Sequence, residues 1–459
     1  MARFTANLEP DLPSPLTVYS AEENPTDSAG APSPKPGAIS WQRNLAAIWV
    51  VQILAIVGFS LRVAFLPFYI ADLGVATVDG QTLWAGLINA GGAGVMALTA
   101  PFWGMIADRR GRRIMLIRAA FAGSVTVAAM ALVSQPWQLL GLRLVEGALT
   151  GTVTAATVLV ATTTPKASLG FALGLLQTAV FAGASIGPLI GGLLADRIGP
   201  RPTFLVAGSM LGLAGVLTLL IVRERFEPPA PAAPSNRPPP VGRLNRVRVA
   251  AGPLLSGAVV TLVLSLFVIR FAAMAVQPLV PLFVASLAPG AADPASLAGL
   301  VLGTLGVTSA ISAVVLGRLG DRLGHRTILL VCVAAAGLLY LPMALARSPW
   351  QLAALQGLFG IAAGGMMPSA NALIADRTPP ERRATVYGIT TSSAAFGAFA
   401  GPLVGAALAI AFGFPAAFVA TGFMLLLLTV AVAVGLPAGG EGRASPLRLH
   451  RRLPPSRDS

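Results

Sequence analysis

The sequence is poor in charged, thiol and imidazole side chains. Only 11% of its 459 residues are charged, and it contains one cysteine, Cys332, and two histidines, His325 and His450. Soluble domains carry about 25% charged residues, so most of this chain is expected to lie in lipid. A single cysteine excludes an intrachain disulfide framework, and so few cysteines and histidines predict no metal site.

Motifs of nucleotide-driven or enzymatic chemistry are also missing. No glycine-rich loop ends in Lys-Ser or Lys-Thr, which argues against an ATP-driven pump. No cluster of histidines and no nucleophile–base pair stands out. We therefore expect neither an enzyme nor a bound cofactor.

Basic residues outnumber acidic ones, 32 to 18, for a formal charge of +14. Their distribution argues against nucleic acid as a partner, because nearly all Lys and Arg lie in, or within about a turn of, segments expected on one side of a membrane. The exceptions are Arg197, Arg201 and Arg347 in expected outer loops and Arg62, Arg143 and Arg270 inside apolar runs. This bias is typical of the positive-inside rule. It predicts that both termini are cytoplasmic.

Apolar runs long enough to cross about 30 Å of hydrocarbon occur in two sets of six, which predicts an all-α membrane protein with twelve spans in two bundles. The runs lie near 45–70, 82–107, 114–133, 137–161, 168–195, 202–222, 251–285, 296–319, 327–346, 350–375, 384–411 and 414–436. The expected domains are a Pro- and Ser-rich cytoplasmic tail (1–44), a first bundle (45–222), a Pro- and Arg-rich linker (223–250), a second bundle (251–436) and a basic tail (437–459).

The two sets of spans are related by an internal repeat. Residues 104–113 read GMIADRRGRR, and residues 317–326 read GRLGDRLGHR. The shared register extends to Gly187-Pro188 and Gly401-Pro402, with a slip of one residue. A parallel repeat of about two hundred residues in apolar helices is typical of a transporter with two similar halves.

The repeated Gly-x-x-x-Asp-Arg-x-Gly-x-Arg loop resembles the loop between the second and third helices of the major facilitator superfamily. Residues 183–192, GASIGPLIGG, resemble the helix-5 motif of its proton-coupled antiporter branch, and Arg143 to Gly147 resemble that branch's Arg-x-x-Gln-Gly motif, with Glu146 at the Gln position. With residues 41–45 and 65–74, the first half looks similar to twelve-span multidrug exporters of the MdtG type. The resemblance covers residues 41 to about 436.

We expect the repeated loops to form a cytoplasmic gate. A carboxylate at a loop can accept hydrogen bonds from a helix N-terminus. The resemblance implies that Asp108 contacts the start of helix 11, near Arg383 and Ala384, and by the repeat we expect Asp321 to contact the start of helix 5, near Ser168. The alternative is that these charges only set topology. The gate residues are Gly104, Asp108, Arg109, Gly111, Arg112, Arg113, Gly317, Asp321, Arg322, Gly324 and Arg326.

Glycines at spacings of four give two expected helices a bare face, which allows close helix packing in lipid. A proline in each helix removes a backbone donor and bends it. We expect the two helices to seal one half against the other. The residues are Gly183, Gly187, Pro188, Gly191 and Gly192 in helix 5, and Gly397, Gly401, Pro402 and Gly405 in helix 11.

The ionisable residues inside the spans are the strongest site candidates, since charge at membrane depth is costly and usually functional. Arg143 and Glu146 are three residues apart on helix 4, and the rise per residue places Arg62 of helix 1 at the same depth. We expect Glu146 to lie between Arg62 and Arg143 and to exchange protons. The alternative is a static ion pair. Arg270 adds a further cavity charge, so the site is expected to favour neutral, zwitterionic or anionic compounds over organic cations.

Polar and large apolar residues within the spans are candidates for orienting a substrate, although each on its own is also ordinary helix packing. They are Gln52, Asn89, Gln177, Gln277, Gln356, Asn371, Phe65, Tyr69 and Met274.

The sequence thus predicts a monomeric secondary transporter of the inner membrane, whose partners are a small-molecule substrate, protons and the lipid bilayer. It would export small amphiphilic compounds in exchange for protons. A carrier for one defined metabolite, such as a sugar or an anionic nutrient, is the alternative. A membrane receptor is disfavoured, because a sensor needs neither the repeated loops nor the paired glycine-rich helices.

Overall fold

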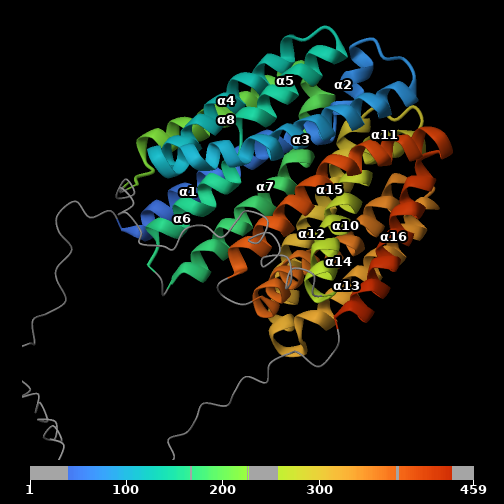
Figure 1. Cartoon of the computed structure of the whole chain (residues 1–459). Helices are drawn as coiled ribbons and strands as arrows, with labels where there is room; N and C mark the ends of the chain where they lie inside the picture. The colour runs from blue at the N-terminus through green and yellow to red at the C-terminus, as the bar shows by residue number, and fades with distance from the viewer. Residues whose placement is uncertain (1–39, 166–167, 225, 227–256, 379–381, 437–459) are drawn as a thin grey trace, which may run out of the picture. The chain divides into compact units, whose positions relative to one another are not determined.

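The computed structural model describes residues 40–165, 168–224, 226, 257–378 and 382–436 (Figure 1). The expected tail 437–459, and nearly all of the tail 1–44 and the linker 223–250, lie outside the described residues. Residues from Trp41 onward form one compact unit. All regular secondary structure among the described residues of this unit is helical.

The helices divide into two sets that match the sequence repeat (Figure 1). The first set is α1 (Trp41–Ser60), η1 (Leu61–Val63), α2 (Leu66–Asp72), α3 (Val78–Arg110), α4 (Arg112–Ala129), η2 (Met130–Leu132), α5 (Pro136–Leu149), α6 (Thr152–Thr163), α7 (Leu169–Ile198) and α8 (Pro200–Leu220). The second is α10 (Gly257–Val276), η4 (Gln277–Leu279), α11 (Val280–Leu287), α12 (Pro294–Leu323), α13 (His325–Ala344), α14 (Pro349–Arg377), α15 (Arg383–Phe412) and α16 (Phe414–Gly435).

These elements provide 12 spans that are long and apolar enough to cross a membrane, six in each set, as the sequence predicts. Four spans combine several elements: α1 with η1, α4 with η2, α5 with α6, and α10 with η4 and α11. Large apolar side chains such as Leu98, Leu427 and Val434 are exposed, as expected of a surface that faces lipid.

The glycines of the repeated loops make the turns between consecutive helices. Gly111 and Gly324 both have a φ of 90°, and each is the single residue between α3 and α4 or between α12 and α13. Residues with a Cβ rarely adopt this conformation. The glycine in the motif therefore lets two long helices reverse direction within one residue.

Close contacts between the two halves lie toward one side of the molecule. They join α7 to α12 and α3 to α15. A Cβ at Gly299 in α12 would meet the carbonyl oxygen of Pro188 in α7, and a Cβ at Gly86 in α3 would meet that of Pro402 in α15. These two junctions correspond to each other in the repeat.

We call the end with the 104–113 and 317–326 loops the motif side and the opposite end the far side. Toward the motif side, a Cβ built on Gly104, Gly174 or Gly317 would meet nothing within 4 Å. Gln177 and Asp108 are exposed there. Among the described residues, the halves are therefore in contact on the far side and apart on the motif side.

Candidate functional site

A buried carboxylate and two arginines form the charged centre of the first half. Glu146 in α5 is 1% exposed, and its Oε1 accepts hydrogen bonds from Nη2 of Arg62 at 3.0 Å and Nη1 of Arg143 at 2.7 Å. The expected position of Glu146 between Arg62 and Arg143 is confirmed. The contact links η1 to α5, that is, helix 1 to helix 4.

The backbone around this cluster is shaped to bring the helices close. A Cβ at Gly147 would meet the carbonyl oxygen of Gly92 in α3, and the side chain of Arg143 packs across Gly92 itself. Just after the cluster the helix is interrupted at Gly151, whose φ is 135°. Helix 4 is therefore two pieces, α5 and α6, with Glu146 in the last turn of the first.

The cluster does not use all of its hydrogen-bonding capacity. Among the described residues, Oε2 of Glu146 and Nη1 of Arg62 are buried without a hydrogen-bond partner. Burying charge with incomplete pairing is costly. Buried polar atoms without a partner are few in folded proteins, so these two atoms call for an explanation beyond helix packing.

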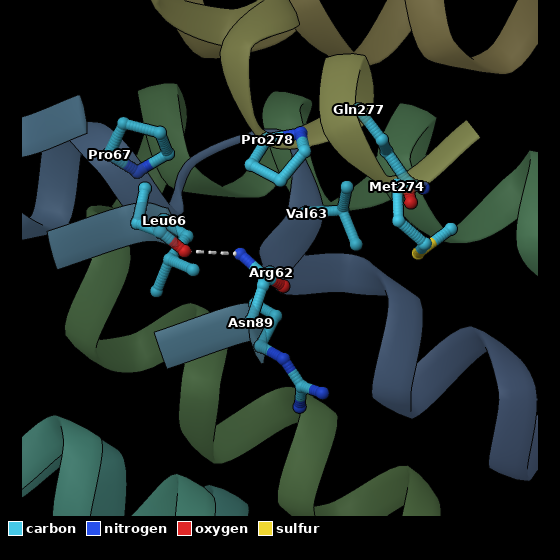
Figure 2. A pocket seen from close by; sticks show the side chains of 9 residues that line it. Arg62, Val63, Leu66, Pro67, Asn89, Met274, Gln277 and Pro278 are labelled. Atoms are coloured by element: carbon cyan, nitrogen blue, oxygen red, sulfur yellow. Dashed lines mark hydrogen bonds between the residues drawn. The ribbon is translucent and has the colours of Figure 1, made fainter. Parts of the chain in front are cut away.

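A pocket between the two halves begins at Arg62 (Figure 2). The first half contributes Arg62, Val63, Leu66, Pro67, Ala85 and Asn89, and the second half contributes Met274, Gln277 and Pro278. Arg62, Asn89, Met274 and Gln277, chosen separately from the sequence, thus line one pocket. Because both halves form its wall, the pocket must change when the halves move.

Other candidates lie elsewhere. Phe65 and Tyr69 are fully buried and pack against Phe204, and the hydroxyl of Tyr69 donates to the carbonyl of Met130. Their expected place in the substrate wall is wrong, because they belong to the core of the first half.

The remaining polar candidates are split between buried and exposed positions. Gln52 in α1 and Gln356 in α14 are buried, while Gln177 in α7 and Asn371 in α14 are exposed, and none of them lines the pocket with Arg62. Arg270 is exposed on α10, where its Cβ faces Gly397 of α15, so it is separate from the Glu146 cluster.

The carboxylates of the motif side make local contacts in this structure. Asp108 accepts from Arg112 at 3.2 Å, and Asp321 pairs with His325 at 3.2 Å; the carboxylate side chains are 68% and 74% exposed. Within the part of the chain that the structure describes, neither carboxylate makes the expected contact with the start of helix 11 or helix 5, which fits the separation of the halves on this side.

Two arginines of the loops tie helices together within each half. Arg113 donates to the carbonyl of Leu219 at the end of α8, and Arg326 donates to the carbonyls of Ala433 and Leu436 at the end of α16. Cations stabilise the carbonyl end of a helix. The two contacts correspond in the repeat.

The glycine stripes of helices 5 and 11 also pack mainly within their own halves. Built Cβ atoms at Gly183, Gly187 and Gly191 would strike α1 or η1, and those at Gly397, Gly401 and Gly405 would strike α10. The expectation that the two stripes seal the halves against each other therefore needs correction. The junctions between halves are α7–α12 and α3–α15.

Two carboxylates that sequence reasoning overlooked make strong contacts. Glu224, after α8, accepts from the backbone N–H groups of Arg112 and Arg113 at 3.0 and 2.7 Å and so caps the start of α4. Asp196, near the end of α7, accepts from Ala295 and Ser296 in the other half. The signal for Asp196 was available in the sequence, since residues 192–201 repeat the loop pattern on the far side.

The comparisons with known proteins agree with this architecture. The family model described as Major Facilitator Superfamily matches residues 48–292 and 262–455. A protein called multidrug resistance protein MdtG from Enterobacter lignolyticus is 36% identical over 402 residues, covering 88% of this chain and 94% of that protein. The protein of the same name from Citrobacter koseri is 37% identical over 398 residues, covering 86% and 95%.

Solved structures show the same fold at low identity. A bacterial homolog of the human lysosomal transporter Spinster, in an inward-facing and occupied conformation, has a TM-score of 0.67 and 16% identity, covering 85% of this chain and 96% of its own. The human organic anion transporter MFSD10 has a TM-score of 0.62 and 19% identity, covering 86% and 100%. Twelve spans in two related halves, the repeated loops and these relatives together show that the chain belongs to the major facilitator superfamily.

Proposed function

We propose that this protein is a proton-coupled exporter of small amphiphilic compounds in the inner membrane, working by alternating access as a monomer. The observation that carries the proposal is the buried Glu146, held by Arg62 and Arg143 where a pocket opens between the halves. Relatives that are 36–37% identical over most of their length are named for multidrug resistance, which supports the class of substrate.

The motif side is proposed to face the cytoplasm. Arg109, Arg110, Arg112 and Arg113 cluster on the loop at that side, and basic loops are retained in the cytoplasm. An even number of crossings, twelve, leaves the N- and C-termini on the same side of the membrane, so both termini would be cytoplasmic. The conformation described above is then open to the cytoplasm and closed to the outside.

Glu146 is the proposed proton carrier. As a carboxylate it ties helix 1 to helix 4 through Arg62 and Arg143. A proton on Glu146 removes the negative charge and weakens both contacts, so that the wall of the pocket is freed to rearrange. Proton exchange would thus be linked to movement of the halves, which is what coupling requires.

The pocket is proposed to favour neutral, zwitterionic or anionic compounds. Nη1 of Arg62 is not engaged by Glu146, and Asn89 and Gln277 offer further hydrogen bonds beside the flexible side chain of Met274. Arg270 adds positive charge on α10. An organic cation would be repelled by these arginines. The one nearby carboxylate, Glu146, is already paired with Arg62 and Arg143 and would not attract it.

Proton movement in energised inside-out vesicles tests the proposal. Neutral, anionic, zwitterionic and cationic compounds would be added to vesicles containing wild type or Glu146→Gln. We expect neutral or anionic compounds to release protons with wild type and not with the variant. Release by cations alone would overturn the charge preference, and binding of a single metabolite without proton release would favour the defined-metabolite carrier.

A further inference from the structure

The far-side end of α7 carries a third copy of the loop pattern. Residues 192–201 read GLLADRIGPR, with the Gly, Asp, Arg, Gly and final Arg at the spacing of residues 104–113. The local structure matches too, because Gly199 has a φ of 89° and joins α7 to α8 as a single residue. Arg201 donates to the carbonyl of Val133, much as Arg113 donates to that of Leu219.

The carboxylate of this copy reaches the other half of the protein. Oδ2 of Asp196 accepts from the backbone N–H of Ser296 at 2.6 Å, and Oδ1 accepts from that of Ala295 at 3.3 Å. Pro294 has no N–H, and the N–H of Leu297 already donates to the carbonyl of Asp293. Asp196 therefore takes both N–H groups that α12 cannot satisfy within itself.

The start of α12 has a second carboxylate suited to the same two groups. Asp293 is the N-cap residue, and Pro follows at the first helical position, the arrangement typical of a self-capped helix. Yet Asp293 makes no side-chain cap and is exposed. At the corresponding helix of the first half, α3, the N-cap Thr77 does cap its own helix, accepting from Gly80 at 3.2 Å.

We propose that Asp196 holds the far side closed by capping α12 across the two halves, and that Asp293 replaces it when the halves part. Opening the far side removes Asp196 and would leave two N–H groups without partners. Asp293 already stands at the N-cap position, with a ψ of 61°, and would accept them once its backbone turns to the extended conformation usual for a capping residue. The exchange keeps the helix capped in both states, so far-side opening is not blocked by the strength of the Asp196 contact.

The packing around the contact supports this role. A Cβ at Gly192, one turn before Asp196, would meet the carbonyl oxygen of Ala295, and one at Gly299 would meet that of Pro188. The backbones of α7 and α12 are thus in direct contact beside the carboxylate. In the repeat, position 196 corresponds to Ile410 of α15, so the matching position at the α3–α15 junction carries no carboxylate.

The test reports far-side opening through a cysteine in the pocket. Val63→Cys is made in a Cys332→Ser background, and its reaction rate with a membrane-impermeant thiol reagent is measured in right-side-out and inside-out vesicles. Asp196→Ala, Asp196→Asn and Asp293→Ala are compared with the control Asp79→Ala, which removes a carboxylate from the first turn of α3 on the same side.

Asp196→Ala is expected to raise the rate from the far side about tenfold, the effect of losing a hydrogen bond to a charged group. Asp196→Asn should raise it less, since the amide oxygen still accepts. Asp293→Ala should lower it, and Asp79→Ala should leave it within about twofold of the background protein. An unchanged rate in Asp196→Ala, or a rise in Asp293→Ala, would overturn the proposal.

The proposal rests on alternating access with a cytoplasmic motif side, and the experiment separates the two ideas. The thiol assay needs neither a substrate nor a proton gradient, so it reports the latch even where no transported compound is found. A reversed orientation would move the Asp196 effect to the inside-out vesicles. That result would correct the proposed orientation and still support the latch.

Discussion

At the scale of single residues, the Glu146 cluster combines a net positive charge with near-complete burial. Arg62 and Arg143 both contact one carboxylate oxygen, so removing the carboxylate leaves two buried guanidinium groups facing each other. Breaking a buried ion pair in this way costs about 3–5 kcal/mol. We therefore expect Glu146→Gln to lower thermal stability as well as transport. A loss of transport in this variant has two causes, the lost stability and the lost proton carrier, which must be separated.

A charge-balanced double variant separates the two roles. Arg62→Gln with Glu146→Gln returns the cluster to the net charge of wild type, so we expect most of the lost thermal stability to be recovered. Proton-coupled transport should remain absent, because no titratable carboxyl is left. Melting temperature in detergent and substrate-driven proton release are the two measurements. Wild-type transport by the double variant would show that the pair is structural only.

The residue-scale predictions succeeded where depth alone decides the contact. Arg62 and Glu146 were matched by counting the rise along two helices, and the structure places them 3.0 Å apart. The prediction for Phe65 and Tyr69 failed because residues 63–70, VAFLPFYI, carry no charged side chain, so the sequence does not show which of them face the pocket and which face Phe204. Both side chains are 0% exposed, so they belong to the core of the first half and not to the pocket.

At the scale of helices, adjacent glycines of α7 face different partners. A Cβ at Gly191 would meet the carbonyl of Leu61 in the same half, whereas one at Gly192 would meet that of Ala295 in the other half. The spacing of the glycines predicts a helix face without side chains, but not which helix packs against it. Pairing of helices 5 and 11 was expected, and the structure instead pairs each with helices on both sides of the interface.

This difference gives a prediction with a built-in control. Gly191→Ala should destabilise the first half by about 1–3 kcal/mol, the usual effect of overpacking, with little change in conformation. Gly192→Ala should instead push the halves apart on the far side, with a thermal stability similar to that of wild type. Melting temperature and far-side reactivity of Val63→Cys would be measured for both. Equal effects of the two substitutions on both readouts would contradict this assignment.

The start of α4 provides a second element-scale prediction. Glu224 accepts from the N–H groups of Arg112 and Arg113, and loss of such a cap typically costs about 0.5–2 kcal/mol. Glu224→Ala should lower the melting temperature, and Glu224→Gln should retain much of it because the amide oxygen still accepts. Asp108→Ala, at an exposed carboxylate of the same loop, is the control and should change the melting temperature little. An equal loss in Glu224→Ala and Asp108→Ala would argue against the cap.

At the scale of the whole molecule, three copies of one loop pattern lie on two sides of the bundle. The far-side copy is engaged through Asp196, while Asp108 and Asp321 on the motif side are exposed and pair within their own loops. Alternating access requires that closing one side accompanies opening the other. The motif-side carboxylates are therefore expected to engage helix starts only when the far side is open.

Opposite effects on one reporter follow from this arrangement. Asp108→Asn with Asp321→Asn should weaken the closed motif side and so lower far-side reactivity of Val63→Cys, by about threefold or more if each helix-end contact contributes about 0.3–1 kcal/mol. Asp196→Ala should raise the same rate. Since Asp108 and Asp321 make only exposed local pairs in the present state, thermal stability should be unchanged in the double variant. An unchanged far-side reaction rate in the double variant would mean that these carboxylates only set topology. A lower rate that returns to the starting value when Asp196→Ala is added would show that the carboxylates of the two sides act on one equilibrium.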